Sequence, residues 1–341
     1  MNIFNRIFRK KEVEDNGNIA KGKELLEMKD VEADTNIVQD REIFGLGNER
    51  ISITTRKKSL WLGKPYHEFL KAAIPIAGEA IQQYIDSHGL KLPQFSWIQT
   101  SFNYPSFQHL CFRYGSEVFS IIVGEYVNSS AIICEEDYNN LINESKTNNL
   151  VPCVVLVDFA SHIAIGESCH LYHAESGQKI ELKEPIIKEC VPMSQWEINN
   201  FGINYLMTYI EKNGGKVFSY CDVLGIAPQI WFEKDGKKSY VFVRSCVAGR
   251  SNEEYEINQN LLLKLLDFEG YFADLKFSSS SPILKDENGL GVPLSERFGK
   301  KDIYAWRGDS FYLHFTGLQP IERAISENEF IKVIVKENYT I

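Results

Sequence analysis

The feature that most constrains the fold of this chain is a similarity between its two halves. YIDSHG at residues 84–89 resembles YIEKNG at residues 209–214. FSW at residues 95–97 follows the first of these segments, and FSY at residues 218–220 follows the second. Because further matches occur in the same order along the chain, the sequence predicts an internal duplication.

Each copy continues with the pattern of a β-hairpin. Pro105 and Pro228 lie ten residues beyond the phenylalanines of FSW and FSY, and each precedes an apolar strand, a glycine turn and a second apolar strand. In the second copy the turn is Asp235-Gly236, a pair that favours a tight primed turn because its residues accept positive φ angles. An acid-led helix is then predicted in each copy, beginning near Glu135 or Glu253.

A final strand completes each copy, and the two strands carry Asp158 and Asp274 as matching aspartates. The copies therefore read helix, strand, strand, strand, helix, strand, which predicts an α/β (α+β) fold of two tandem αβββαβ repeats, each a mixed sheet flanked by helices. The first repeat is expected over residues 57–193 and the second over 194–341. The second opens on a capping box, Ser194 to Glu197, and the first helix of the other copy is expected to begin or bend at Pro75.

Composition places limits on the rest of the chain. The formal net charge of −9 argues against a general nucleic-acid coat, and seven cysteines without a C-x-x-C pair favour reduced thiols. Without an apolar run long enough to span a membrane, we expect a cytoplasmic, bacterial-type protein. Residues 1–48 are predicted to be a disordered tail, in which residues 1–11 form a short basic amphipathic segment suited to weak membrane-surface contact.

The second copy resembles the restriction endonuclease-like, or PD-(D/E)XK nuclease, fold from its first helix through its third strand. In active members an aspartate follows the proline, and a carboxylate-x-lysine pair in the next strand helps to hold Mg²⁺. Here Gln229 occupies the aspartate position, Phe242 the carboxylate position and Arg244 the lysine position. In the first copy Ser106 follows the proline. The resemblance therefore implies a degenerate fold with no catalytic residue, no metal ligand and no cofactor.

Displaced acids are an alternative, because Glu211, Asp222 and Glu233 lie nearby in the sequence and carboxylate oxygens suit Mg²⁺. Small α/β modules of type III secretion chaperones have a similar element order and offer another alternative without catalysis. A zinc site at Cys169, His170 and His173 is disfavoured, since adjacent strand residues point to opposite faces.

We expect a non-catalytic recognition module that binds a protein or nucleic-acid partner. The alternatives are a metal-dependent nuclease with displaced acids and a chaperone- or immunity-like protein that masks its partner. Candidate binding residues come from the nuclease-like face and from a later segment in which cations alternate with aromatic residues. They are Gln229, Trp231, Arg244, Arg250, Arg297, Trp306 and Arg307.

Overall fold

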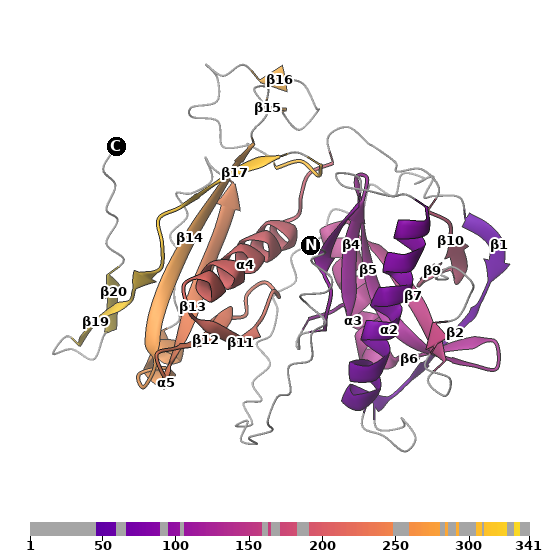
Figure 1. Ribbon diagram of the computed structural model, residues 1–341, viewed down its shortest axis with the longest axis horizontal. Coiled ribbons are helices and arrows are strands. Elements are labelled where there is room, and N and C mark those ends of the chain that lie inside the picture. The colour runs from indigo at the N-terminus through magenta and orange to yellow at the C-terminus, as the bar shows by residue number, and fades with distance from the viewer. Residues whose placement is uncertain are drawn as a thin grey trace.

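The protein is an α+β molecule with two mixed β-sheets in two lobes (Figure 1). The computed structural model describes residues 46–58, 66–88, 95–102, 106–158, 163–164, 171–182, 191–247, 259–279, 284–285, 291–292, 305–308, 310–325 and 331–334. We call the described residues from 46 to 182 the first lobe and those from 191 to 334 the second lobe. The α+β class predicted from the sequence is confirmed.

The first lobe is built on a sheet that runs in the order β1-β10-β9-β7-β5-β4-β3, with β6 pairing β5 and β2, and β8 pairing β7. Its helices are α2 (Tyr66–Ser87) and α3 (Glu135–Asn148). Its strands are β1 (Leu46–Arg50), β2 (Ser52–Arg56), β3 (Phe95–Gln99), β4 (Leu110–Tyr114), β5 (Glu117–Val127), β6 (Ser130–Cys134), β7 (Val151–Asp158), β8 (Ile163–Ala164), β9 (Leu171–His173) and β10 (Gln178–Ile180).

The second lobe has a sheet in the order β11-β12-β13-β14-β17, with β18 beside β14. Its helices are α4 (Gln195–Lys212) and α5 (Gln259–Lys264). Its sheet strands are β11 (Lys216–Tyr220), β12 (Ile230–Lys234), β13 (Lys237–Val247), β14 (Glu269–Ser279), β17 (Phe311–Phe315) and β18 (Gln319–Pro320). Two separate strand pairs are β15 (Leu284–Lys285) with β16 (Gly291–Val292), and β19 (Glu322–Ile325) with β20 (Ile331–Ile334).

The two lobes share one core topology. β3, β4 and β5 form an antiparallel meander and β7 pairs parallel with β5, exactly the arrangement of β11, β12, β13 and β14 in the other lobe. A long helix precedes each meander, and a second helix precedes each parallel strand. The second lobe therefore has the predicted order helix, strand, strand, strand, helix, strand, whereas the first lobe has one further strand, β6, between β5 and α3.

Backbone pairing gives the register that relates the lobes. Leu110 pairs with Ile121 in the first lobe, and Ile230 pairs with Val241 in the second. Positions in the three-strand meanders are therefore related by a constant offset of 120 residues. Both edge strands also contain a register shift at the same place, between Trp97 and Gln99 in β3 and between Val217 and Ser219 in β11.

The first sheet is larger than the predicted repeat. β1 and β2 pair with β10 and β6, so residues 46–56 belong to this sheet, although the sequence analysis assigned residues up to 48 to a tail and began the repeat at 57. The rest of that tail, including residues 1–11, lies outside the described residues. Pro75 lies inside α2, which begins at Tyr66, so the expectation that it begins the helix is wrong.

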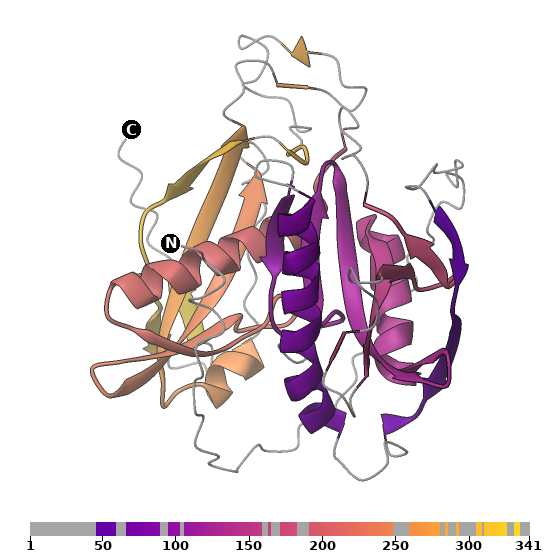
Figure 2. The ribbon, with the colours of Figure 1, turned by 45° about the vertical axis from the view of Figure 1, so that its right-hand side comes forward.

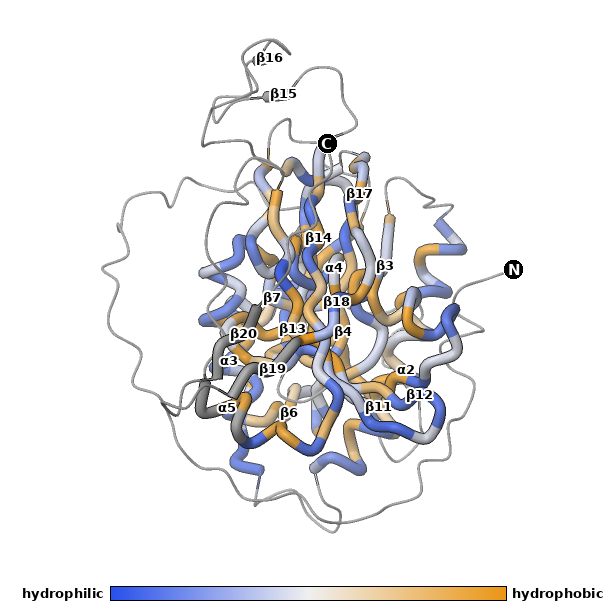
Figure 3. Tube along the Cα trace, turned by 90° about the vertical axis from the view of Figure 1, so that its left-hand side faces the viewer, coloured by the Kyte–Doolittle hydropathy of each residue, from blue (hydrophilic) through white to orange (hydrophobic). Residues whose placement is uncertain are grey.

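Each long helix packs an apolar stripe against one face of its sheet, while the other face is covered by the shorter helix. In the second lobe α4 contributes Ile203, Leu206 and Ile210 to a core with Val241 and Val243. The capping box is present, since Ser194 Oγ accepts from the Glu197 backbone N–H and the Glu197 carboxylate accepts from the Ser194 backbone N–H. Figure 3 shows the hydrophobic strand segments in the interior and hydrophilic residues at the turn between β12 and β13.

Candidate recognition face of the second lobe

The predicted binding residue Gln229 stabilises the β12–β13 hairpin through hydrogen bonds. Its side chain is buried, and its Oε1 accepts a hydrogen bond of 2.9 Å from the backbone N–H of Val243. Its own backbone N–H donates to the Val241 carbonyl at 3.0 Å. Both the side chain and the backbone of Gln229 therefore hold the start of β12 against β13.

His109 has the equivalent role in the first lobe. Its Nδ1 accepts a hydrogen bond of 2.9 Å from the Val123 backbone N–H, and its own N–H donates to the Ile121 carbonyl at 2.8 Å. Residues 109, 121 and 123 each precede their second-lobe counterparts by 120 positions. The structure thus equates Gln229 with His109, and the sequence-based pairing of Gln229 with Ser106 is wrong by three residues.

His109 also belongs to a buried polar cluster that the sequence analysis did not predict. Because Nδ1 accepts from the backbone, the proton lies on Nε2, which donates to Asp137 Oδ2 at 3.2 Å. The Tyr66 hydroxyl donates to the same oxygen, and Lys58 Nζ lies 4.0 Å from Oδ1. Both imidazole nitrogens of His109 therefore form hydrogen bonds. Through Asp137, the cluster links α2, which contains Tyr66, to α3 and to His109, the residue just before β4.

These neighbours stabilise the ionised form of Asp137. Burial raises the pKa of Asp137, but the hydrogen bond and electrostatic interaction with His109, followed by those with Tyr66 and Lys58, lower it below its ordinary value. The carboxylate is therefore ionised at neutral pH. An acid in the first turn of α3 was the sequence signal for this site, but its partners, at residues 58, 66 and 109, are far away in the chain.

Arg244 lies on the face of the second sheet that carries α5. It stands directly opposite Asp274 in the parallel β13–β14 pair. The guanidinium donates twice to that carboxylate, at 2.9 Å from Nε to Oδ1 and at 2.8 Å from Nη2 to Oδ2. Lys276 Nζ lies 3.3 Å from Asp274 Oδ2, and the guanidinium lies 5.5 Å from the ring centroid of Phe272. Two cations therefore share one carboxylate.

All three of these side chains retain some exposure, at 17% for Arg244, 13% for Asp274 and 15% for Lys276. Burial raises the pKa of Asp274, but the hydrogen bond and charge of Arg244, and then Lys276, lower it below its ordinary value. Arg244, Asp274 and Lys276 together contribute one more positive than negative charge at neutral pH, at a partly accessible place on the sheet.

Trp231 lies on the same sheet face as Arg244. Its ring packs edge-on against Phe268 at 5.2 Å between centroids and contacts Tyr240 at 5.6 Å. Phe218 of the edge strand β11 lies 6.4 Å from the Trp231 ring, and 50% of Phe218 is exposed. We define the recognition face as Trp231, Arg244, Phe272, Asp274 and Lys276.

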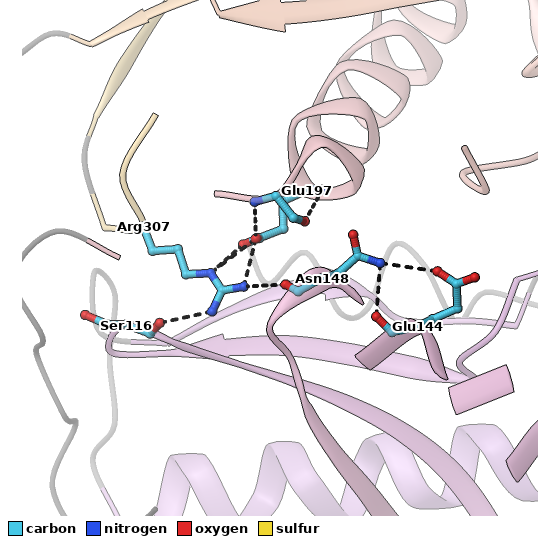
Figure 4. A network of polar contacts seen from close by, with 6 residues as sticks. Ser116, Glu144, Asn148, Glu197 and Arg307 are labelled. Carbon is cyan, nitrogen blue, oxygen red and sulfur yellow. Dashed lines mark hydrogen bonds and ion pairs between the residues drawn. The ribbon is translucent and has the colours of Figure 1, made fainter. Parts of the chain in front are cut away.

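Trp306 and Arg307 are not part of this face, because the side chains of both are buried. Arg307 Nη2 forms a 2.8 Å ion pair with Glu197 Oε2 of α4. The same guanidinium donates to the carbonyls of Ser116, at 3.4 Å, and Asn148, at 3.2 Å, in the first lobe (Figure 4). The burial of Trp306 and Arg307 means that neither side chain is exposed as a contact surface, and Arg307 instead joins the two lobes.

The remaining predicted residues are separated or lie elsewhere. Arg250 and Arg297 lie outside the described residues, as do Cys169 and His170 of the disfavoured zinc site. Glu211 and Glu233 are exposed, whereas Asp222 is buried near α4. Within the ranges that the structure describes, no group of three or more His, Cys, Asp or Glu side chains is arranged to hold a metal ion.

Comparison with known proteins gives one family match. The model of a family described as a domain of unknown function, DUF8840, matches residues 196–321, which span α4 to the end of β18 in the second lobe. Neither the comparison with curated proteins nor that with solved structures gave a match. In the described part of the chain, no helix is long and apolar enough to cross a membrane.

Proposed function

We propose that this protein is a non-catalytic recognition module that binds a protein partner through the recognition face of the second lobe. The observation that carries the proposal is the partly exposed Arg244–Asp274–Lys276 cluster, whose guanidinium lies over the buried ring of Phe272, on the sheet face that also carries Trp231. Arginine and tryptophan are enriched among residues that dominate binding at protein interfaces, because both bury large areas and still form polar contacts.

The groups at the metal-holding positions of the nuclease-like pattern support a non-catalytic role. Gln229 and Arg244 take the places of an acid and a lysine, and both are engaged within the lobe. A neutral amide is a poor substitute for a carboxylate at a Mg²⁺ site. Arg244 retains its proton at any physiological pH, so it does not move protons as a lysine can.

A protein partner is favoured over nucleic acid by charge. The chain carries a formal net charge of −9, and one of the three charges in the cluster is itself acidic. Phosphate binding needs several clustered cations, and the resulting affinity falls steeply with salt. A partner that presents a carboxylate beside an apolar group would complement Arg244 and Trp231.

The test is affinity capture of the full chain from lysates of its native cells, with wild-type protein, Trp231→Ala and Arg244→Gln as baits. Exposed Lys234→Ala is the matched control. We expect one protein to be retained in a stoichiometric amount by the wild type and the control, and at least ten-fold less by the two variants. Equal retention by all four baits would refute the role of this face.

Enzymatic and nucleic-acid activities are tested with the same preparation. Plasmid, single-stranded DNA and RNA are incubated with Mg²⁺ or Mn²⁺, and binding to each is measured at two salt concentrations. We expect neither cleavage nor tight binding. Metal-dependent cleavage that Asp274→Asn or Asp222→Asn abolishes would overturn the proposal in favour of a nuclease with displaced acids.

A further inference from the structure

β3 and β11 are equivalent edge strands of the two sheets, but among the described residues only β3 is covered by the other lobe. β3 is the edge of the first sheet and β11 the edge of the second. Each contains a bulged residue at its register shift, Ile98 in β3 and Phe218 in β11. The loops that lead to β4 and β12 have equal length, because the offset of 120 residues holds on both sides of them.

In the first lobe this edge is covered by α4 of the second lobe. Asn204 Nδ2 donates to the Ile98 carbonyl at 3.5 Å, and Ile98 packs against the cluster that contains Trp196. The Trp196 ring also lies 5.4 Å from the ring of Phe107, in the loop that follows β3. One face of a helix therefore closes the edge strand and its loop together (Figure 2).

Polar contacts extend the same interface. Asn200, one turn from Trp196 on α4, donates to Asp222 Oδ2 at 3.2 Å. Ser106 of the first lobe helps to lower the pKa of that carboxyl, against the larger effect of burial, which raises it. The loop after β3 is thus a docking surface for a helix that presents a residue at each of positions i, i+4 and i+8.

In the second lobe the equivalent surface is open. Phe218 corresponds to Ile98 and is 50% exposed, and Ile226 corresponds to Ser106 and is 39% exposed. Leu224, in the same loop, is 45% exposed. Within the described residues these three are among the few exposed large apolar side chains. The loop position that is polar in the covered lobe is therefore apolar in the open one.

A cation, Lys238, lies next to this apolar surface. Lys238 Nζ lies over the Phe218 ring, 6.0 Å from its centroid. Lys238 is exposed and stands opposite Glu233 in the β12–β13 ladder, without an ion pair between these two side chains. An acidic side chain of a docked partner would find a cation next to the apolar surface.

We propose that Phe218, Leu224 and Ile226 form a docking surface for an amphipathic helix of a partner protein, placed as α4 lies across β3. The partner helix presents apolar residues at i, i+4 and i+8 toward this surface and a carboxylate toward Lys238. Helix-in-groove recognition of this kind takes its affinity from the apolar anchors. This inference rests on the proposed function and adds the location and chemistry of the docking contact.

The experiment places a photo-cross-linking amino acid at Phe218 of the full chain, expressed in its native cells. Tyr312, which is 68% exposed on the opposite edge strand β17, is the matched control position. We expect position 218 alone to cross-link a partner, within a segment whose apolar residues repeat at helical spacing. Cross-links only to other copies of this chain, or equal yields at both positions, would overturn the proposal.

A synthetic peptide of the cross-linked segment then gives a quantitative measurement. We expect it to gain helicity on binding and to lose at least ten-fold in affinity for Phe218→Ser/Ile226→Ser, with no loss for Tyr312→Ser. Lys238→Glu should weaken binding less and only at low salt. Unchanged affinity for the double variant would refute the docking surface.

Failure of this inference is distinguishable from failure of the proposed function. A partner that is lost with Arg244→Gln but fully retained by Phe218→Ser/Ile226→Ser leaves the recognition role intact and refutes the β11 surface. A chain that captures no partner in any form refutes both.

Discussion

Gln229 accepts a hydrogen bond from the backbone N–H of Val243 through its side chain, where the nuclease-like pattern would place a metal-binding aspartate. His109 makes the same contact with Val123 in the first lobe, at the same distance of 2.9 Å. Two chemically different side chains thus satisfy one backbone donor at equivalent places. The requirement that the two lobes share here is a hydrogen-bond acceptor at the start of the second meander strand.

We predict that Gln229→Ala lowers the free energy of unfolding by about 1–3 kcal/mol, because it leaves the buried Val243 N–H without an acceptor. Gln229→Glu keeps an acceptor oxygen and should cost less at a pH where the acid is protonated. Urea denaturation followed by tryptophan fluorescence measures both. The control is Lys234→Ala at the exposed end of β12, and a loss no larger than that of the control would contradict the assigned role.

We predict that Arg307→Met destabilises the protein by about 3–5 kcal/mol, since it leaves the Glu197 carboxylate buried without its cation. The double variant Arg307→Met/Glu197→Gln should recover part of this loss. A double-mutant cycle from denaturation curves isolates the coupling between the two residues. Strictly additive effects would show that the ion pair does not act as a unit.

The core element order could be predicted from the sequence, apart from β6 in the first lobe, whereas the residue-by-residue match between the lobes could not. Sequence similarity aligned FSW with FSY, which pairs Phe95 with Phe218. Backbone pairing instead equates Phe218 with Ile98, three residues further on. The sequence alignment matched aromatic residues to aromatic residues. The register of the strands is instead set by the backbone hydrogen bonds and by the bulge, which cannot be recognised from the positions of aromatic residues.

The match between the last strands shows the same difference. Asp158 and Asp274 were paired as aspartates near the ends of equivalent strands. In the structure Asp274 stands opposite Arg244, and the position in the first lobe that corresponds to Arg244 is Gly124, which pairs with Leu156. The charged cluster is therefore a property of the second lobe alone. Arg244 and Asp274 lie on different strands, and only the pairing of β13 with β14 brings them together.

The cation-rich segment around Trp306 and Arg307 illustrates a different limit. Alternating cations and aromatic residues suit both binding surfaces and buried interfaces. A carboxylate of the same chain that pairs with the cation indicates a buried interface. Glu197 is that carboxylate, and 110 residues separate it from Arg307. The sequence predicted Glu197 as part of a capping box. In the structure this carboxylate both completes the capping box and pairs with Arg307.

We predict that Gly202→Ala destabilises the second lobe, although alanine ordinarily stabilises a helix interior relative to glycine by about 1 kcal/mol. A Cβ at residue 202 would lie 2.0 Å from Ser245 Oγ and 3.1 Å from Ser245 Cβ on β13, so the hydroxyl would have to rotate away and the close approach to the Ser245 Cβ would remain. Overpacking of this kind typically costs about 1–3 kcal/mol. Denaturation of Gly202→Ala and Gly202→Ala/Ser245→Gly should show partial rescue in the double variant, and a stabilised single variant would contradict the close contact.

The buried carboxyl of Asp222 gives a prediction about pH. Trp196 Nε1 and Asn200 Nδ2 donate to its Oδ2 at 3.3 and 3.2 Å, while its Oδ1 accepts no hydrogen bond from the described residues. Burial raises the pKa of Asp222, and the hydrogen bonds from its neighbours only partly oppose this effect. The folded protein therefore holds this proton more tightly than the unfolded chain does.

The sign of the pH dependence follows from that difference. The contribution of Asp222 to stability is fully present below its unfolded pKa, near the ordinary value of 3.8, and is lost as the pH rises through the raised pKa of the folded state. Asp137 and Asp274, whose folded pKa values are lowered, act in the opposite direction and stabilise the protein as the pH rises above their unfolded values. The total stability curve therefore mixes both signs, and only a difference between variants isolates Asp222.

We predict that Asp222→Asn, which keeps an oxygen for Trp196 and Asn200 but carries no charge, becomes more stable relative to wild type as the pH rises from about 4 toward neutrality. Urea unfolding at pH steps from 3 to 8 measures the difference between the two proteins. Asp274→Asn is the control, and its difference from wild type should grow with the opposite sign, because it removes the partner of Arg244. A constant difference between Asp222→Asn and wild type across this range would mean that Asp222 titrates alike in the folded and unfolded states, and that its burial imposes no cost on the contact between the lobes.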